Sequence, residues 1–116
     1  MPEPSWNSAA VRFIDREALL AELRRAAAAA KAARPEIVKV LLFGSFVRGD
    51  WTADSDADLI VVVRQEFADI FERSHYQIHV RSVPTDTLVC SETEFEEGLR
   101  DRTSFLGQTV PTALEL

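Results

Sequence analysis

The chain has 116 residues, of which 47% are hydrophobic and 28% are charged, a composition typical of one folded domain with a single core. Its net charge of −6 argues against a broad nucleic-acid surface, because such surfaces gather Lys and Arg against phosphates. The lone Cys90 excludes an intramolecular disulfide, and no apolar run approaches the ~20 residues of a membrane span. Since no signal-peptide pattern is present either, we expect a cytoplasmic protein without membrane contact.

The start of the chain predicts a short leader followed by a long helix. Residues 1–13 are expected to form a flexible leader, and residues 14–116 one folded domain. The helix is expected to begin after an N-cap at Asp15 and to end near residue 33, because Pro35 follows. Its apolar stripe recurs at three- and four-residue steps and consists of Leu19, Leu20, Leu23, Ala27 and Ala30.

The apolar runs that follow predict alternating strands and helices. Strands are expected at 37–43, 57–63 and 87–90, and helices at 66–76 and 91–101. Residues 78–83 alternate between apolar and polar and predict either a strand or an extended connection. Ser91 and Glu94 have capping-box spacing, whereas the tail from residue 105 is weakly patterned. This order predicts an α/β fold with helices packed on a small mixed sheet.

The stretch LLFGSFVRGDWTADSDADLIVVV (41–63) places a polar loop between two of these strands. Gly44 to Gly49 fits the first part of a P-loop, but Asp50 and Trp51 stand where that motif needs Lys and Ser or Thr. DSDADL (54–59) begins like an EF-hand loop but lacks its Gly and its final Glu. Neither motif explains the stretch.

A third interpretation treats Asp56 and Asp58 as neighbours on one face of a strand. Side chains two residues apart in a strand project to the same side, so the two carboxylates repel each other. A hard divalent cation such as Mg²⁺ relieves this repulsion and keeps coordination positions for substrate phosphates. The pair therefore predicts a site for one or two metal ions.

The loop before the pair offers groups suited to a phosphate. Gly44 allows a ligand to approach the backbone closely, and Ser45 has a hydroxyl and an amide to donate. Arg48 carries a permanent positive charge, although it could instead pair with Asp50 or Asp54. Trp51 could stack on a base or pack on its own domain.

Gly44-Ser45, ten intervening residues, and then Asp56-Ala-Asp58 at a strand resemble the signature of the nucleotidyltransferase superfamily that includes DNA polymerase β. The Arg-Gly in the loop and the Ser-Asp before the strand are similar to those of its minimal, antitoxin-type members. The resemblance covers about residues 15–110 and implies a polymerase β palm-like fold. It also implies a third carboxylate on a later strand; TDTLVCSETEFEEGL (85–99) nominates Asp86, with His79 as the rival.

The resemblance further implies transfer of a nucleoside monophosphate with two Mg²⁺ ions. Asp56, Asp58 and Asp86 would be the metal-binding and catalytic residues, with Asp86 drawing the proton from an attacking hydroxyl. Gly44 and Ser45 would grip the phosphates of ATP or another nucleoside triphosphate, with Arg48 in support.

Such small proteins often neutralise a HEPN-type toxin by adenylylating its tyrosine or by binding it, so the leading hypothesis is an antitoxin nucleotidyltransferase. The second hypothesis is a catalytically degenerate binding module, and the third is transfer to a small molecule. The third conflicts with the short chain unless a homo-oligomer supplies the acceptor pocket.

Overall fold

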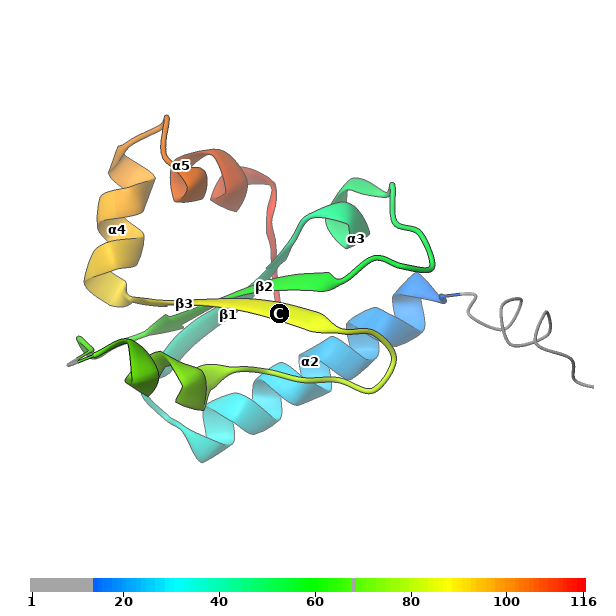
Figure 1. The fold of residues 1–116 in the computed structure, drawn as a ribbon, viewed down its shortest axis with the longest axis horizontal. Helices are drawn as coiled ribbons and strands as arrows, with labels where there is room; N and C mark the ends of the chain where they lie inside the picture. Colours follow the sequence, from blue (N-terminus) through cyan, green and yellow to red (C-terminus); the bar gives the residue numbers. More distant parts are fainter. Residues whose placement is uncertain (1–13, 68) are drawn as a thin grey trace, which may run out of the picture.

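A computed structural model describes residues 14–67 and 69–116, so the predicted leader lies outside the described residues. It confirms the α/β fold: helices pack on both faces of a four-stranded mixed sheet whose strand order is β3-β2-β1-β4 (Figure 1). The described elements, in chain order, are α2 (Arg16–Ala33), β1 (Ile37–Phe43), α3 (Ser45–Arg48), β2 (Ala57–Val63), the 3-10 helix η1 (Ile70–Tyr76), β3 (Thr85–Ser91), α4 (Glu92–Arg100), α5 (Phe105–Thr109), the 3-10 helix η2 (Val110–Thr112) and β4 (Leu114–Glu115).

The strands pair in both directions. β1 runs antiparallel to β2 and to β4, whereas β2 and β3 are parallel. A parallel neighbour requires a crossover connection, and residues 64–84, which include η1, provide it. The parallel pairing brings the N-terminal ends of β2 and β3 to the same edge, next to the turn that follows β1.

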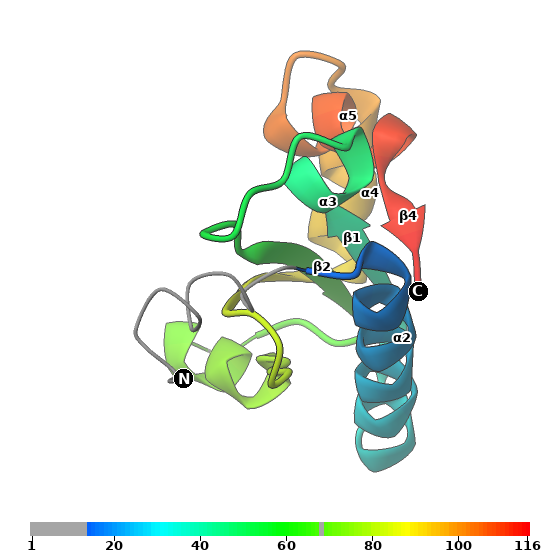
Figure 2. The same ribbon diagram turned by 90° about the vertical axis from the view of Figure 1, so that its right-hand side faces the viewer.

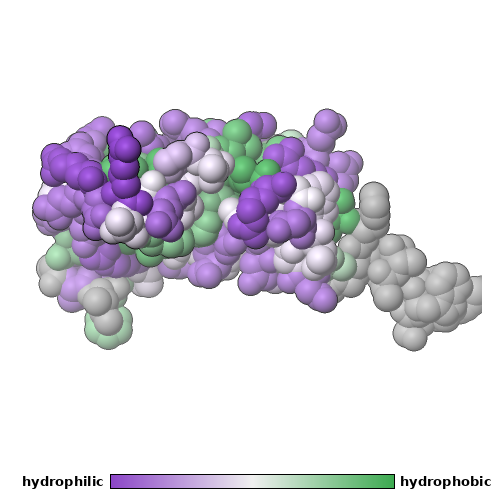
Figure 3. Space-filling view, turned by 90° about the horizontal axis from the view of Figure 1, so that it is seen from above, coloured by the Kyte–Doolittle hydropathy of each residue, from purple (hydrophilic) through white to green (hydrophobic). Residues whose placement is uncertain are grey.

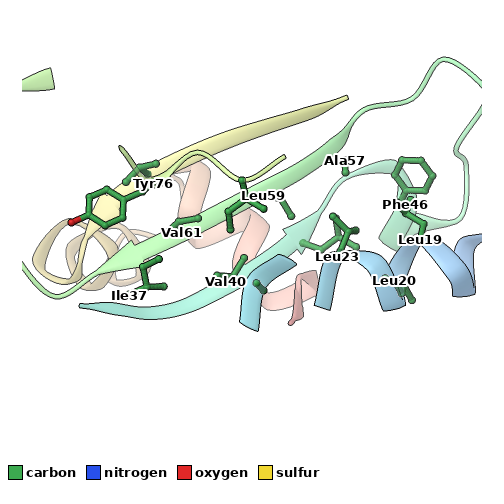
Figure 4. Packing of buried hydrophobic residues seen from close by; sticks show 14 of the residues in the cluster. Leu19, Leu20, Leu23, Ile37, Val40, Phe46, Ala57, Leu59, Val61 and Tyr76 are labelled. Atoms are coloured by element: carbon green, nitrogen blue, oxygen red, sulfur yellow. The ribbon is translucent and has the colours of Figure 1, made fainter. Parts of the chain in front are cut away.

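One face of the sheet packs against α2. The helix begins where it was expected, because the Asp15 side chain accepts hydrogen bonds from the amides of Glu17 and Ala18. Its apolar stripe meets alternate side chains of β1 and β2, and Tyr76 closes the far end of this core (Figure 4). The buried residues labelled in that view are Leu19, Leu20, Leu23, Ile37, Val40, Phe46, Ala57, Leu59, Val61 and Tyr76.

The opposite face of the sheet packs against α4 and α5 (Figure 2). Its core is smaller and consists of Leu41, Ile60, Val62, Cys90 and Phe95. Cys90 is buried there as core filler, and burial raises the pKa of its thiol to about 11. α4 begins with the expected capping box, since Ser91 and Glu94 each accept a hydrogen bond from the other's amide.

Two sequence predictions were wrong in part, and the structure decides a third that the sequence left open. The helix expected at 66–76 is the 3-10 helix η1, which begins only after the Asp69 side chain caps it, and Phe71 is largely exposed. Residues 78–83 form an extended connection with no strand pairing. β3 begins at Thr85, two residues earlier than expected, which places Asp86 inside the strand.

The weakly patterned tail forms the fourth strand. β4 pairs with Leu41 and Leu42 of β1, and the amide of Leu116 donates to the carbonyl oxygen of Val40 at 2.9 Å. A two-residue strand carries too little period-2 pattern to be recognised from sequence. Within residues 14–67 and 69–116, no helix is long and apolar enough to cross a bilayer.

Candidate active site

The site begins at two aspartates on neighbouring strands. Asp58 of β2 lies opposite Asp86 of β3 in the parallel register, and opposite Phe43 of β1 in the antiparallel register. Residues opposite each other in a ladder project to the same face of the sheet, which here is the face that carries α4 and α5. Asp56 precedes β2 by one residue and is exposed. Asp58 and Asp86 thus form a facing pair, and the charge of Asp56 acts on Asp58 from the loop before the strand.

The turn after β1 brings Gly44 against Asp58. Gly44 has φ 87° and ψ −150°, a conformation that is essentially restricted to glycine. A Cβ built on Gly44 would collide with Oδ2 of Asp58, so the carboxylate lies directly against the backbone of the turn. The Gly-Ser turn and Asp58, which were expected to belong to one site, are therefore in contact.

Electrostatics at Asp58 reflect this crowding. Partial burial raises the pKa of its carboxyl, and the charges of Asp86 and Asp56 raise it further, whereas Arg48 lowers it. A carboxylate that is short of positive charge and faces a second carboxylate is suited to a cation. The donor set is composed of oxygens, which fits Mg²⁺ or a similar hard ion.

The described part of the chain contains no cluster of three or more His, Cys, Asp or Glu side chains already arranged to hold a metal ion. The facing pair, Asp58 and Asp86, fits a cation such as Mg²⁺ that needs few protein ligands. Mg²⁺ is commonly held by one or two carboxylates while the substrate's phosphates and water complete its octahedron. These residues fit a metal that enters together with a nucleotide.

The one-turn helix α3 holds the remaining residues of the predicted phosphate site. Ser45 opens it, and Arg48 ends it with its Nε 3.4 Å from Oδ2 of Asp50, both side chains being mostly exposed. Such a surface pair is weak, so Arg48 is free to turn towards a phosphate. Arg16 of α2, which no sequence motif indicated, anchors the turn: its Nε donates to the carbonyl oxygen of Phe46 at 2.6 Å.

Trp51 packs on its own domain. Its ring stacks on Phe46 with ring centres 5.9 Å apart, and it covers the edge of the larger core. His79 is exposed on the extended connection, with Nδ1 3.5 Å from Oγ1 of Thr85. The residue that the structure places opposite Asp58 is Asp86, not His79.

Two adjoining cavities meet at Asp58. One of ≈ 360 Å³ is lined by Gly44, Arg48 and Asp58 together with residues of the tail. The other, of ≈ 420 Å³, is lined by Asp58 and Asp86 and extends along β3. Both share the aromatic pair Phe43 and Phe105, whose rings meet edge to face with centres 5.4 Å apart.

The tail residues of the first cavity are Gln108, Thr109 and Thr112, and sequence analysis missed them together with Phe105. The one local signal for α5 was Ser104, whose side chain caps the helix by accepting a hydrogen bond from the amide of Gly107. Nothing in the local pattern indicated that α5 would return to the aspartates, because that contact depends on how the tail crosses the sheet.

The sequence model described as "Nucleotidyltransferase domain" matches residues 23–109, which include all three aspartates and the Gly-Ser turn. The chain belongs to this nucleotidyltransferase family. A curated relative from Methanocaldococcus jannaschii, named "Putative protein adenylyltransferase", is 33% identical over 64 residues, which are 55% of this chain and 64% of the relative. The match therefore spans less than two thirds of that protein.

A solved structure supports the fold of this nucleotidyltransferase domain. It is described as a "putative nucleotidyltransferase from Sulfolobus solfataricus" and superposes with a TM-score of 0.57 over 71% of this chain and 75% of the other. At 24% sequence identity, this likeness establishes the shared fold alone. The mixed sheet with helices on both faces is thus the nucleotidyltransferase fold.

Proposed function

We propose that this domain transfers AMP from ATP to a hydroxyl group of a partner protein, with the help of divalent metal ions. The observation that carries the proposal is the register of Asp58 with Asp86 beside the Gly44 turn. Membership of the nucleotidyltransferase family supports the reaction type, and the printed name of the curated relative supports a protein as acceptor.

Asp56, Asp58 and Asp86 would hold the metal, for which two Mg²⁺ ions are the expectation from the resemblance. When bound, the cations would neutralise charge on the triphosphate. Gly44 lets phosphate oxygens approach the turn, Ser45 offers its hydroxyl, and Arg48 offers a guanidinium to the phosphate chain.

Asp86 is proposed as the base that accepts the acceptor's proton. The hydroxyl oxygen bonds to the α-phosphorus of ATP, and the bond from that phosphorus to the pyrophosphate oxygen breaks. Its electron pair leaves with pyrophosphate, and the hydroxyl proton passes to the carboxylate of Asp86. The product is an AMP ester of the acceptor.

The resemblance to antitoxin-type members leads us to propose a tyrosine of a HEPN-type toxin as the acceptor. The test incubates the chain with α-labelled ATP, Mg²⁺ and a HEPN-type protein from the same genome. We expect label on the partner with the wild type, and none with Asp58→Asn or Asp86→Asn. Asp54→Asn, which changes an exposed aspartate of the same loop, should transfer normally.

A binding module without catalysis is the second candidate. It is favoured by one observation, namely that the described residues hold no metal cluster of three or more side chains arranged in advance. It predicts that the wild type and Asp58→Asn co-elute with the partner equally well and that neither labels it. That result would contradict the transferase proposal.

A further inference from the structure

A third cavity continues the site along β3. It has a volume of ≈ 630 Å³ and lies between β3, α4 and α5. Leu88 and Phe105 line both this cavity and the one that contains Asp58 and Asp86. We call it the β3–α5 groove; its lining includes Leu88, Cys90, Glu97, Gly98, Asp101 and Phe105. The groove therefore opens onto the carboxylates from the side away from Gly44 and Arg48.

The groove exposes apolar side chains that folding would normally bury. Leu88 keeps 42% of its surface exposed and Phe105 keeps 53%, whereas their neighbour Cys90 is buried. Figure 3 looks onto the molecule from above the view of Figure 1 and shows hydrophobic residues surfacing among hydrophilic ones. Exposed apolar surface beside polar groups is a common mark of a binding surface.

The charge along the groove is negative. Arg73 is the one cation among its lining residues. Its guanidinium donates to both carboxylate oxygens of Glu94 at 2.9 Å and to the carbonyl oxygen of Val89 at 2.7 Å, so Glu94 balances its charge. Glu97 and Asp101 remain as unbalanced lining charges, and the hydrogen bonds that Thr103 donates to Asp101 favour its ionised form.

We infer that the β3–α5 groove docks the acceptor, a segment of a partner protein that carries an apolar side chain next to Lys or Arg and presents its hydroxyl to Asp86. The inference rests on the proposed function. The apolar side chain would cover Leu88 and Phe105, and the cation would lie near Glu97 and Asp101. Asp86 lines the adjoining cavity, which shares Leu88 and Phe105 with the groove, and an acceptor's hydroxyl has to arrive there.

Charge argues against the other occupants. A triphosphate would be repelled by Glu97 and Asp101, whereas the cavity beside Gly44 offers Arg48. A second copy of this chain carries the same net charge of −6 and the same acidic groove, so it lacks complementarity.

The experiment measures binding of two labelled peptides by fluorescence polarisation, without nucleotide. Both contain a tyrosine and a leucine, flanked by lysines in one and by glutamates in the other. Glu97→Lys is compared with Glu96→Lys, because Glu96 is an exposed neighbour on α4 that does not line the groove. Leu88→Ala is compared with Leu99→Ala, since Leu99 is 38% exposed but lies outside the groove.

We expect the lysine peptide to bind at least about tenfold more tightly than the glutamate peptide. Glu97→Lys and Leu88→Ala should each weaken it about tenfold, while the two control variants bind like the wild type. Equal binding of both peptides, no binding of either, or equal effects of Glu96→Lys and Glu97→Lys would overturn the inference. ATP binding and oligomeric state are measured separately for Leu88→Ala, by equilibrium dialysis and gel filtration. Weaker ATP binding in this variant, or dissociation of a wild-type dimer, would also overturn the inference.

The same peptides are measured with Asp58→Asn. Selective binding by this variant supports the groove even though it transfers no AMP. If the wild type binds the peptides selectively but transfers no AMP, the proposed function is contradicted. The assignment of the groove as a docking site is then still supported.

Discussion

At the scale of single residues, the site brings together groups that would be more stable apart. Asp58 is partly buried, faces Asp86 and lies against Gly44, and its raised pKa records the cost of that charge. An aspartate without a function would not be expected at a position that destabilises its charge in this way. Such local cost is common at sites where function, not stability, has selected the residue.

Replacing Asp58 by Asn should therefore stabilise the fold while it removes activity. The amide keeps the shape of the side chain but removes a partly buried charge and, with it, the repulsion by Asp86 and Asp56. We expect a higher midpoint of thermal unfolding at pH 7, together with loss of AMP transfer, because Asp58 is a proposed metal-binding residue. The control is Asp54→Asn, which should change neither quantity. A lower unfolding midpoint for Asp58→Asn would contradict the electrostatic account of this residue.

Gly44 and Gly49 form a matched pair for testing the contact with Asp58. Both have positive φ, 87° and 95°, but a Cβ on Gly49 meets nothing within 4 Å. Gly49→Ala should cost about 1 kcal/mol of unfolding free energy from backbone strain alone. Gly44→Ala should cost about 2–4 kcal/mol, because strain and the collision with Asp58 add. Denaturant unfolding measures both; equal costs would show that Gly44 does not touch the carboxylate.

At the scale of elements, the start of α4 is fixed to the crossover connection. Glu94 completes the capping box with Ser91 and also accepts two hydrogen bonds from Arg73 of η1. This links the helix that forms one wall of the β3–α5 groove to the connection that allows β2 and β3 to run parallel. Ion pairing with Arg73 lowers the pKa of Glu94 to about 2.

Glu94→Gln isolates this ion pair, because Gln can still complete a capping box. Glu94 has a depressed pKa in the folded state, so its contribution to stability is present above its ordinary pKa of 4.5 and is lost as the pH falls towards about 2. Since Glu94 is 44% exposed, solvent screening limits the loss at pH 7 to about 1 kcal/mol.

Urea unfolding at several pH values gives the measurement. The difference between wild type and Glu94→Gln should shrink below pH 4.5 and approach zero near pH 2. Glu96→Gln is the control, because Glu96 lies on the same helix but outside the capping box and the ion pair with Arg73. Its unfolding free energy should differ much less from that of the wild type. A difference for Glu94→Gln that does not change with pH would contradict the role of the ion pair.

At the scale of the whole molecule, local signals in the sequence predicted most of the fold. Asp15, Pro35 and the capping box of Ser91 set helix boundaries through contacts a few residues away, and the structure has them as predicted. Elements that depend on contacts between residues distant in the chain were not predicted. β4 exists because Leu41 and Leu42 offer it an edge, and no pattern near residue 114 reveals that partner.

The same division holds for the site. The Gly-Ser turn and the aspartate pair are close in sequence, and the resemblance supplied Asp86. Phe105 and Gln108 reach the cavities only because α5 folds back over the sheet, so nothing in their own sequence neighbourhood could place them there. The groove that we assign to the acceptor depends on this return of the tail.

The central claim is that Asp58 and Asp86 together bind a divalent cation with a nucleotide. Its most direct test is an electron paramagnetic resonance titration of Mn²⁺ in the presence of a non-hydrolysable ATP analogue. We predict that the wild type and Asp54→Asn bind the ion alike, and that Asp58→Asn and Asp86→Asn each bind it on the order of 10–100-fold more weakly. Unchanged Mn²⁺ affinity in both Asp58→Asn and Asp86→Asn would contradict the account.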